Sequence, residues 1–387
     1  KYMLDWCARA MKGEGTVIIG DCPLQGCNFQ KLMALSHMDE IVQQANQQYP
    51  HLVVKTEDWR LTVLNRQEYL GRSTYAQQSI KDDTDAGSLR DYTLVDVGQE
   101  SFLEEISDYA EYFRVTMYKP SLMLAHHCPG KHEYLLTKRF CHTDLLINLP
   151  KMKTHIKTGL TGALKNLVGI NGHKEFLPHH IRGSYFTGGD CYCVDNLFSR
   201  WADKVYDSWW ETYTEMPFLK RKTFSFFYHL LHAVAGKTGG DRISAGSWSG
   251  NETLWRTILD LNHILYFSPN APKRIITIID GIVAGEGEGP LTPSPKKAGL
   301  LVGGENPAFV DAVLARLMGY NISRIPMVYH ALTHRRSKLA ASDIKDFVVD
   351  ILEGGKLEPL PINQLPPIGF KKPAYWRRAS IPLSAIR

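Results

Sequence analysis

Hydrophobic and polar positions alternate along the chain in blocks that predict strands and helices in turn. A short apolar run at residues 16–19 predicts a strand, residues 28–47 predict a helix, and residues 51–56 predict a second strand. This order is that of a βαβ unit. Near-continuous apolar runs at residues 144–148 and 275–280 predict buried parallel strands. We therefore expect an α/β protein with a mostly parallel sheet flanked by helices.

Composition changes along the chain and predicts four segments. Residues 1–182 should form an α/β part, and residues 183–270, rich in aromatic residues, a helical insertion or cap. Residues 271–345 should form a second α/β part, and residues 346–387 an extended basic tail rich in proline. The chain opens inside a predicted helix at residues 2–11, so we expect a further segment upstream of it.

The residues that follow the predicted strand at 144–148 combine many cations with small polar residues. Lys151, Lys153 and His155 alternate, so an extended run would point all three to one side. Glycines at 159 and 162 should let main-chain amides approach a ligand. The pattern predicts a site for a carboxylate or phosphate, and a solvated basic loop is the alternative. The predicted anion-binding residues are Lys151, Lys153, Thr158, Thr161, Asn166, His173 and Lys174.

One histidine in this motif adds a group that can transfer protons. The unperturbed pKa of histidine lies near neutrality, and cationic neighbours would favour its neutral, base-competent form. Residues 161–167 predict the first turns of a helix, whose N-terminus adds partial positive charge and which carries Lys165. His155 and Lys165 are therefore the predicted catalytic residues.

A set of acidic residues follows the predicted strand at 275–280. Asp280 should end that strand, and a glycine-rich loop at 281–290 should carry Glu286 and Glu288 over a ligand. Carboxylates so placed suit Mg²⁺, Mn²⁺ or sugar hydroxyls. We expect Asp280 and Glu286 to face the same cleft as the basic motif, and a solvated surface loop is the alternative.

Two stretches of the basic motif resemble a known family. They are Asn-Leu-Pro-Lys-Met-Lys-Thr-His at residues 148–155 and Thr-Gly-Leu-Thr-Gly-Ala-Leu-Lys-Asn-Leu-Val-Gly at residues 158–169. They look like the signature of the bacterial and archaeal family catalogued as domain of unknown function 362. Further matches lie at residues 20–25, 280–290, 304–311 and 316–319. The resemblance implies membership of the family and no particular activity.

A more remote resemblance suggests a chemistry. The order and spacing of Lys153, His155, Gly159, Thr161, Gly162, Lys165 and Gly169 are similar to those in lactate racemase and its nickel-pincer relatives. The resemblance implies that His155 is an acid/base and that Lys165 tethers the pincer nucleotide. Those enzymes hold nickel with a later histidine, for which His179 and His180 are loose candidates. Their second catalytic histidine is replaced here by the turn at residues 20–23, Gly-Asp-Cys-Pro.

Charge and cysteine content exclude several classes of protein. A formal charge of +5 over 387 residues gives no warrant for a nucleic-acid-binding face. Seven cysteines without regular spacing favour a reducing, cytoplasmic compartment and argue against an iron–sulfur cluster. The apolar run at residues 224–236 is too short to span a bilayer, so no transmembrane segment is expected. A buried helix is its first interpretation, and peripheral contact with a membrane beside Lys-Arg-Lys at 220–222 is the second.

These patterns together predict an enzyme that acts on a small anionic metabolite. The substrate would be a hydroxy acid or an acidic or phosphorylated sugar, and the reaction would use histidine acid/base chemistry in a lysine-rich pocket, with Mg²⁺ or Mn²⁺ as an optional cofactor. The first alternative is a non-catalytic protein that binds an anion or a glycan precursor. The second is a racemase or epimerase that depends on the nickel-pincer nucleotide. Loss of His155 separates the first alternative from an enzyme, because a binding protein should tolerate it.

Overall fold

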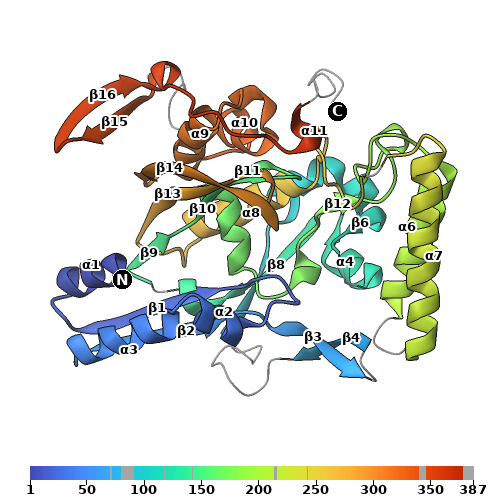
Figure 1. The fold of residues 1–387 in the computed structure, drawn as a ribbon, viewed down its shortest axis with the longest axis horizontal. Coiled ribbons are helices and arrows are strands. Elements are labelled where there is room, and N and C mark those ends of the chain that lie inside the picture. The colour runs from blue at the N-terminus through green and yellow to red at the C-terminus, as the bar shows by residue number, and fades with distance from the viewer. Residues whose placement is uncertain are drawn as a thin grey trace. The chain divides into compact units, whose positions relative to one another are not determined.

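A computed structural model describes most of the chain and divides it into two compact units (Figure 1). The described residues are 1–69, 72–79, 91–116, 119–141, 143–212, 216–241, 243–339 and 346–377, with main chain alone at 64–69, 72–79 and 218. The first unit comprises Lys1–Leu94, Leu135–Lys138 and Gly169–Lys174. The second comprises Val95–Tyr134, Arg139–Val168 and Glu175–Arg387. The end of the predicted tail, residues 378–387, lies outside the described residues.

The first unit is built on a parallel pair of strands joined by helices. β1 (Gly15–Asp21) pairs with β2 (Leu52–Asp58) along their whole length. α2 (Phe29–Leu35) and α3 (Met38–Gln48) connect them, which confirms the predicted βαβ unit. The single helix expected over residues 28–47 is wrong, because His37 takes a left-handed backbone conformation (φ 54°) between the two helices. The other elements of this unit are α1 (Tyr2–Ala10), β3 (Thr62–Tyr69) and β4 (Arg72–Ser79).

The second unit contains a mixed sheet. β9 (Leu145–Asn148) and β10 (Lys151–His155) pair one after the other, both in parallel, with β13 (Arg274–Glu288). β11 (Gly159–Thr161) runs antiparallel to β10, and β14 (Thr292–Gly304) runs antiparallel to β13. The α/β class is confirmed, but this sheet is not mostly parallel as expected. The reason is the long β13–β14 hairpin, in which main-chain pairing with β14 holds the predicted glycine loop at 281–290 as strand up to Glu288.

Helices of the second unit cover this sheet and form a separate hairpin. α8 (Leu254–Phe267) and α9 (Pro307–Leu317) are almost entirely buried, and the short α5 (Ala163–Asn166) contacts both. α6 (Leu197–Glu211) and α7 (Phe218–Lys237) pack side by side as two long helices (Figure 1). The four segments predicted from composition stay a prediction. The remaining elements are β5 (Tyr92–Asp96), β6 (Phe113–Arg114), α4 (Pro120–His126), β7 (His127–Cys128), β8 (Lys131–Thr137), β12 (His180–Ile181), α10 (Pro326–Thr333), β15 (Val348–Glu353), β16 (Lys356–Pro361) and α11 (Ala374–Arg377).

Across the described residues, none of the helices combines the length and the apolar character that crossing a membrane requires.

Candidate functional site

One face of β10 and β11 runs from solvent into the interior of the second unit. Met152 and Thr154 are fully buried on the other face of β10. Along the first face, the side chain of Lys151 is 47% exposed, Lys153 is half-buried, and His155 is only 6% exposed. β11 continues this face, because Lys153 lies opposite Thr161 in the antiparallel register. The predicted alternation therefore places Lys153, His155 and Thr161 on one face, with the histidine at its buried end.

The turn between β10 and β11 is held by aromatic side chains from later in the chain. Trp376 Nε1 donates to the carbonyl of Ile156 at 2.8 Å, and the Tyr320 hydroxyl donates to the carbonyl of Gly159 at 3.0 Å. Gly159 has a positive φ of 80°, and a Cβ there would lie 2.6 Å from Cδ1 of Ile325. The glycine is thus explained by backbone conformation and packing, whereas the sequence suggested close approach to a ligand.

A buried carboxylate fixes the helix that carries Lys165. Asp311 on α9 accepts hydrogen bonds from the main-chain N–H groups of Ala163 (2.6 Å) and Leu164 (3.0 Å). A Cβ on Gly162 would lie 2.0 Å from Oδ1 of Asp311, so this position admits only glycine while Asp311 holds the helix. Burial raises the pKa of Asp311 to about 7. Asp311 therefore positions α5 from within the fold.

His155 is held in one tautomer by the turn that follows it. Its Nδ1 accepts hydrogen bonds from the main-chain N–H groups of Lys157 (3.1 Å) and Thr158 (3.3 Å). Burial, and then the charges of Lys165 and Lys157, hold the pKa of His155 well below its ordinary value. The ring is therefore neutral at pH 7, as expected, and its single proton lies on Nε2. In this form His155 is a hydrogen-bond donor at Nε2.

Two histidines at the start of β12 belong to the same electrostatic cluster. His179 lowers the pKa of His155, and its Nδ1 donates to the carbonyl of Leu177 at 2.7 Å. In its neutral form His179 therefore carries its lone pair on Nε2, opposite to His155. His180 is 6% exposed, and its Nδ1 has no hydrogen-bond partner in the part of the chain that the structure describes. Burial, and then Lys157 and His179, hold the pKa of His180 well below its ordinary value.

Lys157 joins this cluster although it was not among the predicted site residues. Its Nζ donates to the carbonyl of Ala245, and burial lowers the pKa of Lys157 to about 8, while Cys191 and Asp190 oppose that shift. The residue follows Ile156 in the turn, beyond the end of β10, although the spacing of two residues from Lys151 to His155 continues to it. The spacing therefore did signal Lys157, and the structure places its partly buried side chain in the cluster.

Two side chains predicted for the anion site make local hydrogen bonds. Thr158 donates through its hydroxyl to the carbonyl of Leu160 at 3.0 Å. Asn166 donates to the side-chain carbonyl of Asn148 at 2.7 Å. Thr161 differs from them, because its buried Oγ1 has no hydrogen-bond partner among the described residues. Of these three polar side chains, Thr161 is the one whose geometry suits a ligand.

The predicted acidic residues lie on the strand beside β10, and both already have partners within the protein. Asp280 lies opposite Lys151 and pairs with its Nζ at 2.6 Å, with both side chains about half exposed. The expectation that Asp280 neighbours the basic strand is confirmed, but the expectation that it ends a strand is wrong, because β13 continues to Glu288. Glu286 accepts from the main-chain N–H of Lys371 at 2.9 Å. Among the described residues no group of three or more His, Cys, Asp or Glu could hold a metal ion, so the metal role of Asp280, Glu286, His179 and His180 stays a prediction.

The last part of the basic motif belongs to the first unit. Lys174 is half-buried, and its Nζ donates to the carbonyl of Cys22 at 3.0 Å. Burial lowers the pKa of Lys174, while Cys22 and Asp21 oppose the shift. His173 is also buried in this unit, where its carbonyl accepts from the side chain of Asn171. The structure therefore gives Lys174 a polar environment of its own within the first unit.

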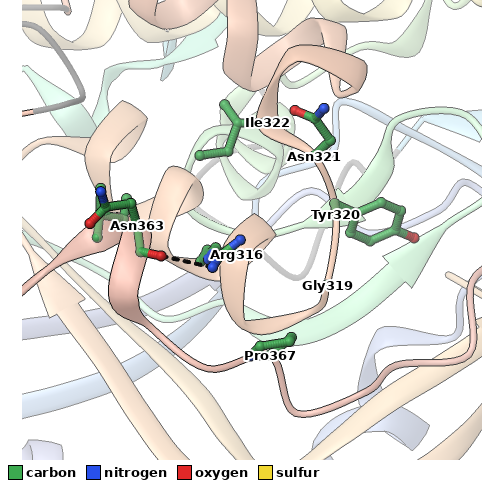
Figure 2. Close-up of a pocket in the computed structure, with 8 residues that line it drawn as sticks. Arg316, Gly319, Tyr320, Asn321, Ile322, Asn363 and Pro367 are labelled. Carbon is green, nitrogen blue, oxygen red and sulfur yellow. Dashed lines mark hydrogen bonds between the residues drawn. The ribbon is translucent and has the colours of Figure 1, made fainter.

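A separate pocket of about 540 Å³ lies on the second unit, between the end of α9 and the residues after β16 (Figure 2). Arg316 uses its guanidinium to hold the carbonyls of Asn363 (2.8 Å) and Leu365 (3.1 Å). The lining includes Gly319, Tyr320, Asn321, Ile322, Ile362 and Pro367, and no His, Cys, Asp or Glu among the described residues. The one acid/base group in this lining is the Tyr320 hydroxyl, which already donates to the carbonyl of Gly159, so the His155 cluster is the better candidate site.

Comparison with known families matches residues 90–316 to a model described as "Domain of unknown function (DUF362)". This range contains β9, β10, β11, β12, β13 and β14, and with them the whole histidine–lysine cluster. Neither the curated proteins nor the solved structures include a significant match to the chain.

Proposed function

We propose a function on the premise that this chain belongs to the family of the domain of unknown function DUF362, as its motifs indicated. In this proposal the protein is an enzyme that binds a small anionic metabolite at the buried end of the β10–β11 face and moves a proton on it. The supporting observation is that the two histidines adopt different tautomers. His155 carries its proton on Nε2, whereas neutral His179 carries its lone pair on Nε2. Both rings belong to one electrostatic cluster that also contains Lys153, Lys157 and Lys165.

The residues divide the chemistry between charge and proton transfer. The lysines would hold the carboxylate or phosphate of the substrate by charge-assisted hydrogen bonds. His179 Nε2 would take the proton from the carbon next to a carbonyl or carboxyl group, so that the C–H bond breaks and its electron pair moves toward the oxygen. His155 Nε2–H would donate to that oxygen as negative charge develops on it. Thr161 Oγ1 and His180 Nδ1, which lack partners among the described residues, would hydrogen-bond the substrate's remaining polar atoms.

This arrangement favours a hydroxy acid, or an acidic or phosphorylated sugar, as the substrate class. These molecules combine an anionic group with an acidic C–H bond or with a carbonyl group into which the charge can move. Return of the proton to the same carbon or to its neighbour would make the reaction an isomerisation or an epimerisation. No metal enters the proposed step.

The nickel-pincer cofactor is not part of the proposal, because the residues do not complete its site. The turn that would carry the second catalytic histidine supplies Asp21 and the buried Cys22. An intact mass equal to that of the bare sequence would support this exclusion, and added mass on Lys165 would contradict it.

Exchange of the substrate proton with solvent tests the proposal directly. The protein is incubated in D₂O with lactate, glucuronate or a sugar phosphate, and loss of the proton signal next to the carboxyl or carbonyl group is followed by NMR. We expect exchange with at least one probe. His179→Gln should remove exchange and leave anion binding, measured by calorimetry, within about threefold.

Two variants of His155 form the matched control. In His155→Asn the side-chain carbonyl can still accept from the turn, but the donor at Nε2 is lost, so exchange should fall by about 10²–10³-fold. His155→Gln places an amide near the former Nε2 and should recover part of the rate. Anion binding without exchange of any probe would leave the non-catalytic binding protein as the better description. Binding and exchange that both survive His155→Asn would show that the site lies elsewhere.

A further inference from the structure

α7 differs from the other helices of the second unit in its charge. Over 20 residues it carries Lys220, Arg221, Lys222 and Lys237 and no acidic residue. Its inner side packs against α6, where Tyr228 lies 5.1 Å from Tyr206 between ring centroids. Ala235 on the same helix is fully buried. α7 therefore has one packed side and one side that does not contribute to the core.

The outer side of α7 presents large apolar side chains to solvent. Leu219 is 77% exposed, Phe226 63%, Phe227 49% and Leu230 44%. At about 100° per residue, Leu219, Phe226 and Leu230 fall on one stripe, with Phe227 beside it. The same geometry places the exposed Lys220 and Lys222 on opposite flanks of this stripe. We call these residues, 219, 220, 222, 226, 227 and 230, the outer face of α7.

We propose that the outer face of α7 docks on an anionic lipid surface. A helix that lies in the plane of a membrane buries an apolar stripe among the acyl chains and places lysines on its flanks, where they reach the headgroups. The packed side of α7 is covered by α6, so the rest of the unit remains in water. The helix has no acidic residue, and its cations, at residues 220–222 and at Lys237, complement anionic headgroups at both of its ends.

Charge also disfavours a second copy of the chain as the occupant. Two outer faces in a symmetric contact would bring like charges together without an acidic residue from either helix. A membrane-spanning arrangement is disfavoured as well, because α7 falls short of the apolar character that crossing requires. When α7 lies in the plane of the membrane, its apolar stripe contacts the acyl chains and its flanking lysines contact the headgroups.

Vesicle flotation tests the proposal with the full chain. Vesicles of phosphatidylcholine alone are compared with vesicles that contain phosphatidylglycerol as about one third of the lipid. We expect binding to the anionic vesicles and not to the neutral ones, weakened by added salt. Lys220→Glu with Lys222→Glu should lower binding more than tenfold, since each lysine near the surface contributes a factor of about five. Phe226→Ser with Leu230→Ser should lower binding about tenfold or more.

The β15–β16 hairpin offers matched controls, because it lies at the far side of the second unit from α7 (Figure 1). Lys356→Glu and Leu357→Ser change the same residue types at exposed positions, and Leu357 is 67% exposed. These variants should bind vesicles like the parent protein. The proposal is overturned by a parent protein that ignores anionic vesicles, or by binding that the α7 variants leave unchanged. Self-association that the α7 variants abolish, without any vesicle binding, would likewise assign this face to a second copy.

Discussion

The two ends of the basic motif lie in different units, and their cations have different kinds of neighbour. In the first unit, Lys174 lies near Asp21 and Asp58, and the buried Arg60 bonds Asp58 and three main-chain carbonyls. In the second unit, the charged neighbours that shift the pKa of His155 most are Lys165, Lys157, His179 and Lys153. We infer that the carboxylates and carbonyls around the first set of cations stabilise the fold, whereas the proposed function uses the second set to hold an anion from solution. Lys157 has both kinds of neighbour, since Asp190 also acts on it.

The largest expected effect falls on the first unit. Arg60 is 1% exposed and pairs with Asp58, whose Oδ2 lies 2.5 Å from Nη2 of the arginine. Arg60→Met would leave a buried carboxylate without its partner, so the free energy of unfolding should fall by about 3–5 kcal/mol. Chemical denaturation measures this loss. Anion binding by the variant protein that remains folded should be unchanged. A loss of anion binding by the folded variant would show that the first unit also contributes to the anion site.

The second expected effect falls on Lys165 in the second unit. Lys165→Met should weaken anion binding by about 10–100-fold, because one charge-assisted contact of about 1.5–3 kcal/mol is lost. It should also raise the pKa of His155, on which Lys165 is the strongest charged neighbour. Nitrogen chemical shifts of labelled histidine measure that pKa during a titration. Lys165→Arg keeps the charge and is the control. An unchanged pKa of His155 in the Lys165→Met variant would show that Lys165 is not part of the site.

The third effect is a pH dependence that reports on Lys157. Burial lowers its pKa to about 8, so between pH 8 and the unfolded value near 10.5 the unfolded chain binds more protons than the folded one. The free energy of unfolding should therefore rise with pH in this window, by up to about 3 kcal/mol from this group. Anion affinity should fall over the same range as the lysine loses its charge. Lys157→Met should flatten both curves, and equal slopes in parent and variant would contradict the assignment.

The smallest effect concerns the unpartnered hydroxyl of Thr161. Thr161→Val keeps the shape and removes a buried Oγ1 that lacks a hydrogen-bond partner among the described residues. The free energy of unfolding should rise by up to about 1 kcal/mol, while anion affinity falls about 3–10-fold. Thr158→Val is the control, because the hydroxyl of Thr158 already bonds the carbonyl of Leu160. A loss of stability in the Thr161 variant would show that this hydroxyl serves the fold.

Local patterns in the chain were sufficient for several elements. The βαβ unit followed from the apolar runs and the turn residues between them, and the structure adds that the side chain of Asn28 caps α2 by accepting from the N–H of Lys31. The alternation of Lys153 and His155 placed both on one face, since a strand has a period of two residues. These inferences succeeded because they depend on neighbours in the sequence. The prediction of a loop for the glycine-rich stretch after Asp280 was wrong, because the strand structure of this stretch depends on pairing with β14.

The sequence by itself determined the α/β class, the family and the set of residues from which a site could be chosen. The tertiary structure decided which of them serve the fold. It gave Lys174 to the first unit, used Asn166 and Thr158 in local hydrogen bonds, and buried Lys157 beside His155. It also brought His179, which directly precedes β12, into the cluster. Burial and charge neighbours set pKa values and tautomers, and both depend on distances in space that spacing along the chain does not determine.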